Sequence, residues 1–300
     1  GRRGHFITSP EVGPLFGVVM ANYLDAQWAR LGRPDPFTVV DVGAGPGTLA
    51  RSVSSAAPRC APALHYVAVE LSERQRSLHP DGIESRADLP SAPFRGVIVA
   101  NELLDNLPFR LAVFDGGWRE AYVAEEQGGR LVEELGPVLD PVPPELPERP
   151  ALGARAPLVD RAASWVDEAR SLLTGGSLLV IDYAVATTAE LAGRPWRDWL
   201  RTYRGHERGG HYLADPGRQD ITTDVPIDQL PTPDSVCDQA TWLRDHGLDE
   251  LVDEGRRRWT EGAATGDLDA LRMRSRISEA EALTDPTGLG GFRVLEWQPG

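Results

Sequence analysis

A glycine-rich turn most constrains what this chain can fold into. Residues 37–42 form a short β-branched run, Phe-Thr-Val-Val-Asp-Val, and the next five residues are Gly-Ala-Gly-Pro-Gly. Residues 48–57 can then form a helix. The three glycines of the turn allow positive φ and a close approach of the backbone to a ligand. The sequence therefore predicts a strand, a ligand-binding turn and a helix in direct succession.

Apolar runs that end on polar residues recur along the chain. Three further runs, 64–70, 96–102 and 177–183, have this form, and a helix is predicted over 159–174. Apolar runs without alternation are typical of strands that are buried on both faces of a parallel sheet. The predicted fold class is therefore α/β, with a Rossmann-like, mostly parallel, doubly wound sheet.

Two stretches interrupt this alternation. Three β-like segments separated by Gly-Gly turns predict an inserted antiparallel β-meander over residues 109–138. The segments are 109–114, 118–126 and 130–135. The Pro-rich segment 137–157 is predicted to be an extended connection without a core of its own. The polar segment 194–224 lacks periodicity, and we expect a long loop there on the substrate side.

The two ends of the chain complete the predicted fold. A helix is predicted from Ser9 to about Leu31, because an N-cap and a proline precede apolar residues at helical spacing. Residues 235–238 and 292–297 are predicted strands, and 241–258 is mostly helix. We expect a single domain over residues 1–300.

Composition narrows the classes of partner. The chain has 45 acidic and 31 basic residues and a formal charge of −14, so its field repels phosphates, which argues against nucleic acid and permits a basic substrate. Cys60 and Cys237 are the only cysteines, and no Cys/His cluster predicts a metal site. No apolar run of about 18 residues predicts a membrane span, and no cleavable leader is apparent. We therefore expect a cytoplasmic location.

The turn is similar to a known cofactor-binding motif. A dinucleotide motif would have glycine at position 48, where Thr48 stands. The pattern D-x-G-x-G-x-G over residues 41–47 instead resembles the first motif of class I S-adenosylmethionine (SAM) methyltransferases, whose loop holds the amino acid end of the ligand. Glu70 ends the second strand, where a carboxylate can accept hydrogen bonds from both ribose hydroxyls. Asp88 and Leu89 are placed to hold an adenine amine and an adenine face.

Several motifs in a fixed order extend this resemblance from Gly4 to Trp297. They lie at 4–12, 100–108, 117–120, 181–183, 215–217 and 220–225. Together they resemble the MidA-type family, which includes mitochondrial complex I assembly-factor methyltransferases and their bacterial relatives. The resemblance implies a SAM-binding, seven-stranded fold and, for the mitochondrial members, symmetric dimethylation of an arginine in a respiratory-complex subunit. It also implies that Thr8 and Ser9 place the first helix over SAM. The predicted cofactor site comprises Thr8, Ser9, Asp41, Gly43, Ala44, Gly45, Gly47, Glu70, Leu71, Asp88, Leu89 and Asn101.

Arginine methylation makes a specific demand on the acceptor side. A guanidinium has a pKa above about 12, so carboxylates must orient it and receive the proton released as the methyl arrives. Ligands of a doubly wound sheet bind outside the carboxyl ends of the strands, where Asn101, Glu102 and Asp105 follow the fourth strand. Glu102 is the first candidate for the carboxylate that orients the guanidinium and accepts its proton. Asp105 is either its partner or a helix cap, and Asn101 is a hydrogen-bonding partner of SAM or of the substrate.

Four further residues are candidates for binding the substrate. They are Asp182 and Tyr183, after the fifth strand, and His206 and His211, in the polar segment. No ligand spacing predicts a metal there. We expect a SAM-dependent methyltransferase that acts on an arginine nitrogen of a protein. The alternatives are a methyltransferase acting on N or O of a small molecule, as in a bacterial biosynthetic pathway, and an assembly chaperone that binds SAM.

Overall fold

The computed structural model describes residues 8–204, 207–262 and 268–299. Contacts divide the chain into two compact units. Of the described residues, the sheet unit comprises those within 8–102, 169–181 and 234–299, and the insert unit comprises those within 103–168 and 182–233. Within the described residues, no helix is both long and apolar enough to cross a membrane.

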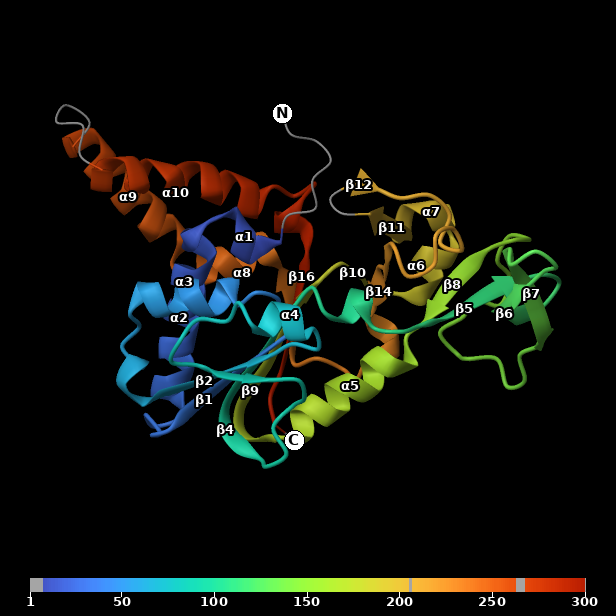
Figure 1. The fold of residues 1–300 in the computed structure, drawn as a ribbon, viewed down its shortest axis with the longest axis horizontal. Coiled ribbons are helices and arrows are strands. Elements are labelled where there is room, and N and C mark those ends of the chain that lie inside the picture. Colours follow the sequence, from blue (N-terminus) through green and yellow to red (C-terminus); the bar gives the residue numbers. More distant parts are fainter. Residues whose placement is uncertain (1–7, 205–206, 263–267, 300) are drawn as a thin grey trace. The chain divides into compact units, whose positions relative to one another are not determined.

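A seven-stranded sheet forms the centre of the sheet unit, in the order β15-β16-β9-β4-β1-β2-β3 (Figure 1). Its strands are β1 (Phe37–Val42), β2 (Leu64–Val69), β3 (Glu84–Arg86), β4 (Phe94–Asn101), β9 (Leu173–Asp182), β15 (Ser235–Asp238) and β16 (Arg293–Trp297). β1 pairs in parallel with β2 and β4, and β4 pairs in parallel with β9, whereas β15 and β16 are antiparallel. The predicted α/β class with a mostly parallel sheet is confirmed.

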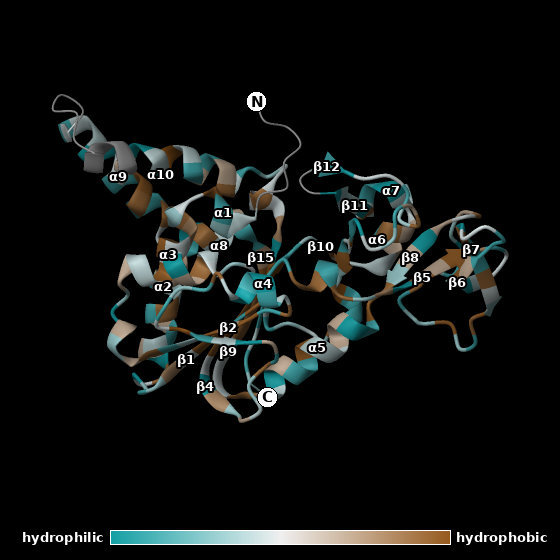
Figure 2. Ribbon diagram, in the orientation of Figure 1, coloured by the Kyte–Doolittle hydropathy of each residue, from teal (hydrophilic) through white to brown (hydrophobic). Residues whose placement is uncertain are grey.

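The central strands pack closely because their residues are apolar or very small. All six residues of β1 are buried. A Cβ atom added at Gly96 would lie 1.8 Å from the carbonyl oxygen of Thr38, so β4 can approach β1 only with glycine at this position. Figure 2 shows hydrophobic residues along the strands of this sheet, whereas the short helix α4 is hydrophilic.

Seven α-helices belong to the described residues of the sheet unit. They are α1 (Ser9–Val12), α2 (Pro14–Arg30), α3 (Thr48–Ala56), α4 (Glu73–Arg76), α8 (Gln239–Asp245), α9 (Leu248–Gly262) and α10 (Leu268–Thr284). The single helix expected from Ser9 to Leu31 is wrong, because the chain breaks at Gly13 and restarts at Pro14. Proline has no N–H to donate and is favoured in the first turn of a helix, so α2 begins there. Helix α10 was not predicted from the sequence.

The meander of the insert unit belongs to a four-stranded antiparallel sheet with the order β7-β6-β5-β8. Its strands are β5 (Arg110–Phe114), β6 (Trp118–Glu125), β7 (Leu131–Val138) and β8 (Arg155–Leu158). The three predicted β-segments are confirmed. The expectation of a coreless connection over 137–157 is wrong at its end, because β8 pairs with β5 and buries Ala156. Leu146, in the middle of that segment, belongs to the same apolar cluster as Trp118.

The polar segment of the insert unit is more regular than expected. Residues 194–224 contain a short helix, α7 (Trp196–Trp199), and a three-stranded antiparallel sheet in the order β12-β11-β13. These strands are β11 (Leu200–Arg204), β12 (Glu207–Arg208) and β13 (Asp220–Thr223). The expectation of a loop is therefore wrong for these residues. Leu200 and Trp199 are buried in a cluster with Leu111 and Val113, which gives the segment a core.

Helix α5 (Asp160–Ser171) lies between β8 and β9 in the chain, as expected from the sequence. The remaining elements of the insert unit are short: the helix α6 (Thr188–Ala192), the paired two-residue strands β10 (Ala184–Val185) and β14 (Val225–Pro226), and two 3-10 turns, η2 (Leu104–Asn106) and η3 (Ile227–Gln229).

Candidate functional site

The glycine turn follows β1 in the geometry that the sequence predicts. Gly43, Gly45 and Gly47 have φ values of 74°, 53° and 78°, in the left-handed region that favours glycine. Ala44 lies between them and is nearly fully buried. No heavy atom lies within 4 Å of the position that a Cβ of Gly45 would occupy. The turn therefore leaves space over Gly45 for a ligand to approach the backbone.

Glu70 closes β2 and contacts this turn. One carboxylate oxygen, Oε2, accepts the backbone N–H of Gly45 at 3.1 Å, and Oε1 accepts the backbone N–H of Ser72 at 2.8 Å. A carboxylate oxygen can accept two hydrogen bonds, so each oxygen can take one more from a ribose hydroxyl. Glu70 thus holds the turn, and its carboxylate retains acceptor capacity that a ribose could use.

His79 is a contact of the turn that the sequence analysis missed. Its Nε2 atom lies 2.9 Å from the carbonyl oxygen of Gly45, and its Nδ1 atom lies 2.8 Å from the hydroxyl of Ser85. Both backbone groups of Gly45 are therefore held, the N–H by Glu70 and the carbonyl by His79. No local motif surrounds His79, so only the folded structure reveals this contact.

Asp41 is a buried residue of β1, two positions before the turn. It is 3% exposed, and its Oδ2 accepts the hydroxyl of Tyr66 at 3.0 Å. The pKa of Asp41 is raised to about 7, because the increase from burial and from the charge of Glu70 exceeds the decrease caused by the bond from Tyr66. The bond from Tyr66 to Asp41 therefore joins the side chains of β2 and β1.

Asn101 and Glu102 lie where β4 ends. Glu102 is 9% exposed and has a φ of 55°, a strained conformation for a non-glycine residue that is common at functional sites. The side-chain amide of Asn101 donates to Oε1 of Glu102 at 3.1 Å. The Oδ1 atom of Asn101 is buried and has no hydrogen-bond partner among the described residues. A ligand donor that reached this oxygen would satisfy it.

The other predicted cofactor residues differ in their exposure and in their contacts. Asp88 is exposed, Leu89 is half-buried, and Leu71 is 83% exposed. The backbone N–H of Thr8 donates to Glu11 at 3.1 Å, and the buried hydroxyl of Ser9 donates to Gln239 at 2.8 Å. Thr8 and Ser9 thus anchor the start of α1.

These residues fit a nucleoside cofactor that carries an amino acid. The turn offers exposed backbone over Gly45, Glu70 offers oxygens for ribose, and Asn101 offers a buried acceptor. All of them belong to the sheet unit and lie at the carboxyl ends of β1, β2 and β4. This end of a parallel sheet is where ligands of doubly wound folds bind.

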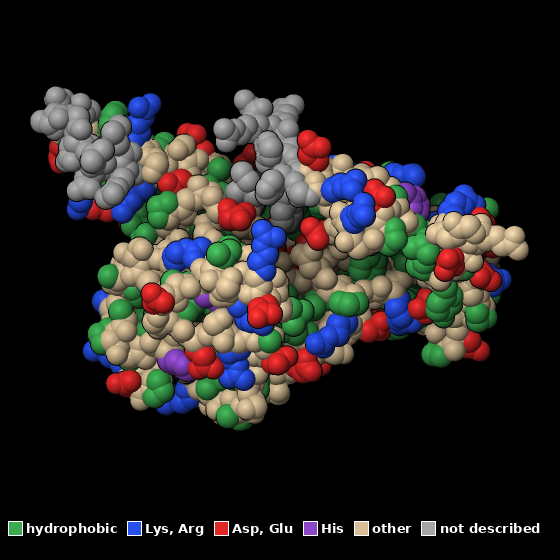
Figure 3. All heavy atoms as spheres, viewed as in Figure 1, with side chains coloured by type: hydrophobic (Ala, Val, Ile, Leu, Met, Phe, Trp, Pro, Cys, Tyr) green, Lys and Arg blue, Asp and Glu red, His purple; other side chains and the backbone are tan. Residues whose placement is uncertain are grey.

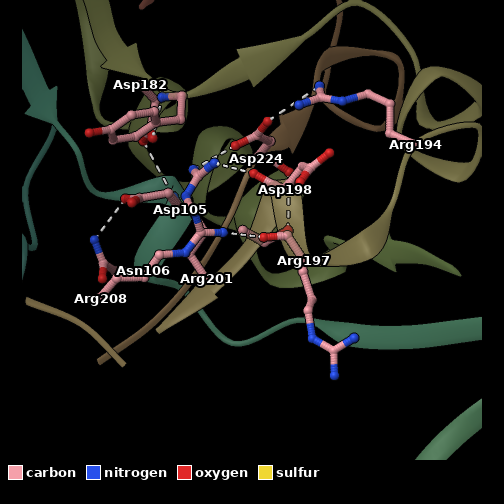
Figure 4. A network of polar contacts seen from close by, with 11 residues as sticks. Asp105, Asn106, Asp182, Arg194, Arg197, Asp198, Arg201, Arg208 and Asp224 are labelled. Atoms are coloured by element: carbon pink, nitrogen blue, oxygen red, sulfur yellow. Dashed lines mark hydrogen bonds and ion pairs between the residues drawn. The ribbon is translucent and has the colours of Figure 1, made fainter. Parts of the chain in front are cut away.

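The insert unit holds Asp105 and Asp182 in one polar network (Figure 4). Asp182 accepts the backbone N–H groups of Leu104 at 2.7 Å and Tyr183 at 2.8 Å, which orders the turn η2. Asp105 is fully buried within that turn and accepts the side-chain amide of Asn106 at 2.7 Å. Its Oδ2 has no hydrogen-bond partner among the described residues.

The environment of Asp105 is not that of a helix cap. The residue before η2 is Leu103, and no side chain caps the turn. Burial raises the pKa of Asp105 to about 7, although the positive charge of Arg201 lowers it. Of the two roles left open for Asp105, the geometry therefore does not support the cap.

Arg201 and Asp224 also belong to this network, and neither was predicted to have a role. One guanidinium nitrogen of Arg201 donates to Oδ1 of Asp224 at 2.6 Å, and Arg194 lies 3.7 Å from Oδ2. The guanidinium of Arg201 also lies 5.0 Å from the centre of the Tyr183 ring. Asp224 stands in a motif that carried the family resemblance, and this was the one available signal.

Of the two histidines predicted to bind substrate, the structure describes only His211. His211 stacks on Tyr212, with ring centres 4.4 Å apart. His206 lies outside the described residues, as do residues 4–7 of the first motif. Among the described residues, no group of three His, Cys, Asp or Glu side chains is arranged to hold a metal ion.

Comparison with protein families gives one match that covers most of the chain. Residues 19–241 match the family described as "Putative S-adenosyl-L-methionine-dependent methyltransferase".

Several animal proteins that are named as protein arginine methyltransferases are similar to this chain. The mouse mitochondrial protein arginine methyltransferase NDUFAF7 is 25% identical and aligns with 99% of this chain and 83% of its own length. The Drosophila melanogaster homologue is 26% identical over 75% of this chain, and the human protein is 25% identical over 77% of it. The chain spans 59% of the length of each of these last two relatives.

Two solved structures from Burkholderia thailandensis share the fold. One COG1565 superfamily member, bound to S-adenosyl-homocysteine, has a TM-score of 0.78 and 24% identity and covers 98% of this chain and 79% of its own. A second COG1565 structure has a TM-score of 0.81 and 24% identity and covers 97% and 81%. The likeness extends over nearly the whole chain.

One expectation is corrected by these relatives. The location expected from the sequence is the cytoplasm. The curated relatives are named as mitochondrial proteins, which contradicts that expectation.

Proposed function

The chain belongs to the family of S-adenosyl-L-methionine-dependent methyltransferases, and from this membership we propose that it methylates an arginine nitrogen of a protein substrate. The observation that carries the proposal is Glu102, a glutamate in a strained backbone conformation at the carboxyl end of β4. The names of the curated relatives, protein arginine methyltransferases, support the arginine acceptor.

The residues of the sheet unit would hold the cofactor as follows. Gly43, Gly45 and Gly47 offer backbone to its amino acid end, and Glu70 accepts hydrogen bonds from its ribose. Asn101 offers a buried oxygen to a donor of the cofactor or of the substrate. When bound, SAM supplies an electrophilic methyl group on a sulfonium. The task of the protein is then to align the acceptor nitrogen and to exclude water.

Glu102 is proposed as the group that orients the guanidinium and accepts its proton. A carboxylate can bind a guanidinium through two parallel hydrogen bonds, which fixes the plane of the acceptor. The bond from Asn101 holds one oxygen of Glu102 in place, so its rotamer is defined before the substrate arrives. The proton leaves the guanidinium nitrogen as the new C–N bond forms, and the carboxylate receives it.

Asp105 is proposed as a second carboxyl group on the acceptor side. Its Oδ2 is buried and has no hydrogen-bond partner among the described residues, which suits a donor brought by a ligand. Tyr183 and His211 stay predictions as substrate contacts. Asp182 accepts hydrogen bonds from the backbone N–H groups of Leu104, Asp105 and Tyr183, so its observed contribution is to support the turn that carries Asp105.

The test combines cofactor binding with methyl transfer. Calorimetric titration with SAM and S-adenosylhomocysteine is expected to show micromolar binding that Gly45→Arg and Glu70→Ala abolish. Transfer of a labelled methyl group to proteins, followed by mass spectrometry for methylarginine, is expected for the native chain. Glu102→Gln should bind SAM normally and lose transfer by about 10²-fold or more.

The outcomes separate the alternatives. Label found only in small metabolites would replace the protein acceptor with a small molecule. SAM binding without transfer to any acceptor, together with an unaffected phenotype for Glu102→Gln, would indicate an assembly chaperone instead.

A further inference from the structure

The insert unit contains a cavity that the proposed function leaves unused. It has a volume of about 410 Å³ and is lined by residues of β5, β6, β11 and β13. Most of its lining is apolar, including Phe109, Leu111, Ala121, Leu200 and Ile221. Ligand pockets of proteins have volumes of about 300–1,000 Å³, so this cavity is large enough to hold a bulky side chain of a bound protein segment.

The cavity opens to solvent through an apolar rim. Three large hydrophobic side chains that line it are exposed: Val123 by 61%, Tyr122 by 52% and Ile221 by 39%. Exposed apolar residues that cluster around a hollow mark interaction sites more often than scattered ones do. Figure 3 shows hydrophobic side chains at the surface of the part formed by β5, β6 and β7. An open apolar rim suits a protein segment better than a small metabolite, which would need a closed pocket.

The carboxylates that line the cavity are paired. Glu120 lies 3.0 Å from Arg110. Glu133 accepts two hydrogen bonds from Arg155, at 2.5 and 2.7 Å, and a further one from the hydroxyl of Tyr212. The pairs leave little uncompensated negative charge for a guanidinium. The matching occupant is therefore a neutral, apolar side chain.

The cavity adjoins the polar network through two of its residues. Asn106 lines the cavity, and its side-chain amide donates to Asp105 at 2.7 Å. Leu200 lines it from β11, and the next residue of that strand is Arg201. A side chain held in the cavity would place its neighbouring residues near Asp105.

We infer that this cavity binds a neutral apolar side chain of the protein substrate, near in sequence to the arginine that is methylated. The inference rests on the proposed function for the identity of the substrate. Binding in the cavity selects substrates in which a bulky apolar residue flanks the arginine.

Peptide binding tests the inference without relying on methyl transfer. The probes are fluorescein-labelled peptides with one arginine and one variable position, two to four residues away, that holds Phe, Leu, Asp or Gly. Fluorescence anisotropy measures their affinity for the SAM-loaded chain. Val123→Asp places a charge on the rim, and Ala121→Trp fills the cavity. Val142→Asp is the matched control, because Val142 is 45% exposed and does not line the cavity.

The expected result is at least tenfold tighter binding of the Phe or Leu peptides than of the Gly peptide. Val123→Asp and Ala121→Trp should remove this preference, and Val142→Asp should keep it. Equal affinities for all peptides, or a preference that survives Val123→Asp in a folded protein, would overturn the inference. Binding with the expected preference but without methylation would instead count against the proposed function alone.

Discussion

The Nε2 atom of His79 lies 2.9 Å from the carbonyl oxygen of Gly45, at the centre of the glycine turn. A carbonyl oxygen only accepts hydrogen bonds, so Nε2 must carry the proton. In neutral His79, Nδ1 then accepts the hydroxyl of Ser85, 2.8 Å away. The Gly45 peptide unit is thus oriented by a side chain 34 positions later in the chain.

We predict that His79→Ala weakens SAM binding about tenfold, because the Gly45 carbonyl is then free to turn and the site is less preorganised. His65→Ala is the control, since His65 pairs with Glu84 where both side chains are more than 40% exposed. Calorimetry with S-adenosylhomocysteine provides the measurement. An unchanged affinity for His79→Ala would show that the turn holds its shape without this contact.

Gly96→Ala is predicted to destabilise the sheet unit by about 3 kcal/mol, because the added Cβ would overlap the backbone oxygen of Thr38 and force β4 away from β1. Gly210→Ala is the control, since nothing lies within 4 Å of its Cβ position and its φ is ordinary. Urea unfolding compares the two variants. Equal stability of both would contradict the close approach of the strands.

Arg201→Met is predicted to cost about 3 kcal/mol in the free energy of unfolding. It leaves the carboxylate of Asp224, whose side chain is 10% exposed, without its closest cation. Arg256→Met is the control, because Arg256 and Asp253 are more than 60% exposed and such pairs contribute at most about 1 kcal/mol. Thermal and urea unfolding measure the loss of stability in both variants. An equal loss in the two variants would contradict the larger contribution of the buried pair.

Asp41 is predicted to make stability depend on pH. Burial raises its pKa in the folded chain to about 7 from an ordinary value of 3.8. Between these values the unfolded chain loses the proton and the folded chain keeps it, so stability falls as the pH rises through this window. Asp41→Asn removes the titration and can still accept the bond from Tyr66.

The measurement is the free energy of unfolding of the native chain and of Asp41→Asn at pH 5 and pH 8. Relative to the variant, the native chain is expected to lose roughly 3 kcal/mol over this interval, at 1.36 kcal/mol per pKa unit. A constant difference between the two proteins would mean that Asp41 is ionised at both pH values.

The central strands and the glycine turn were predictable because their signals are local. The apolar runs that form β1, β2, β4 and β9 favour burial through their own composition. The positive φ values of Gly43, Gly45 and Gly47 are a property of the glycine turn itself. Glu70, Asn101 and Glu102 could be placed at the carboxyl ends of strands for the same reason. Their exact contacts with Gly45, and with one another, could not.

The insert unit was harder to predict because its elements depend on distant partners. β8 pairs with β5, so that Arg110 lies opposite Leu158, and β11 pairs with β13, so that Leu200 lies opposite Thr223. Short strands with polar residues and prolines show no clear period, and only the partner strand satisfies their backbone groups.

By itself, the sequence determined the fold class, the glycine turn after β1 and the acidic residues that follow β4, since each is encoded in neighbouring residues. Only the tertiary structure decided the roles of His79, Arg201 and Asp224 and the existence of the cavity beside Asn106. Each of these arises where side chains far apart in the chain meet, and a hydrogen bond or a cavity exists only once the backbone has brought them within contact distance.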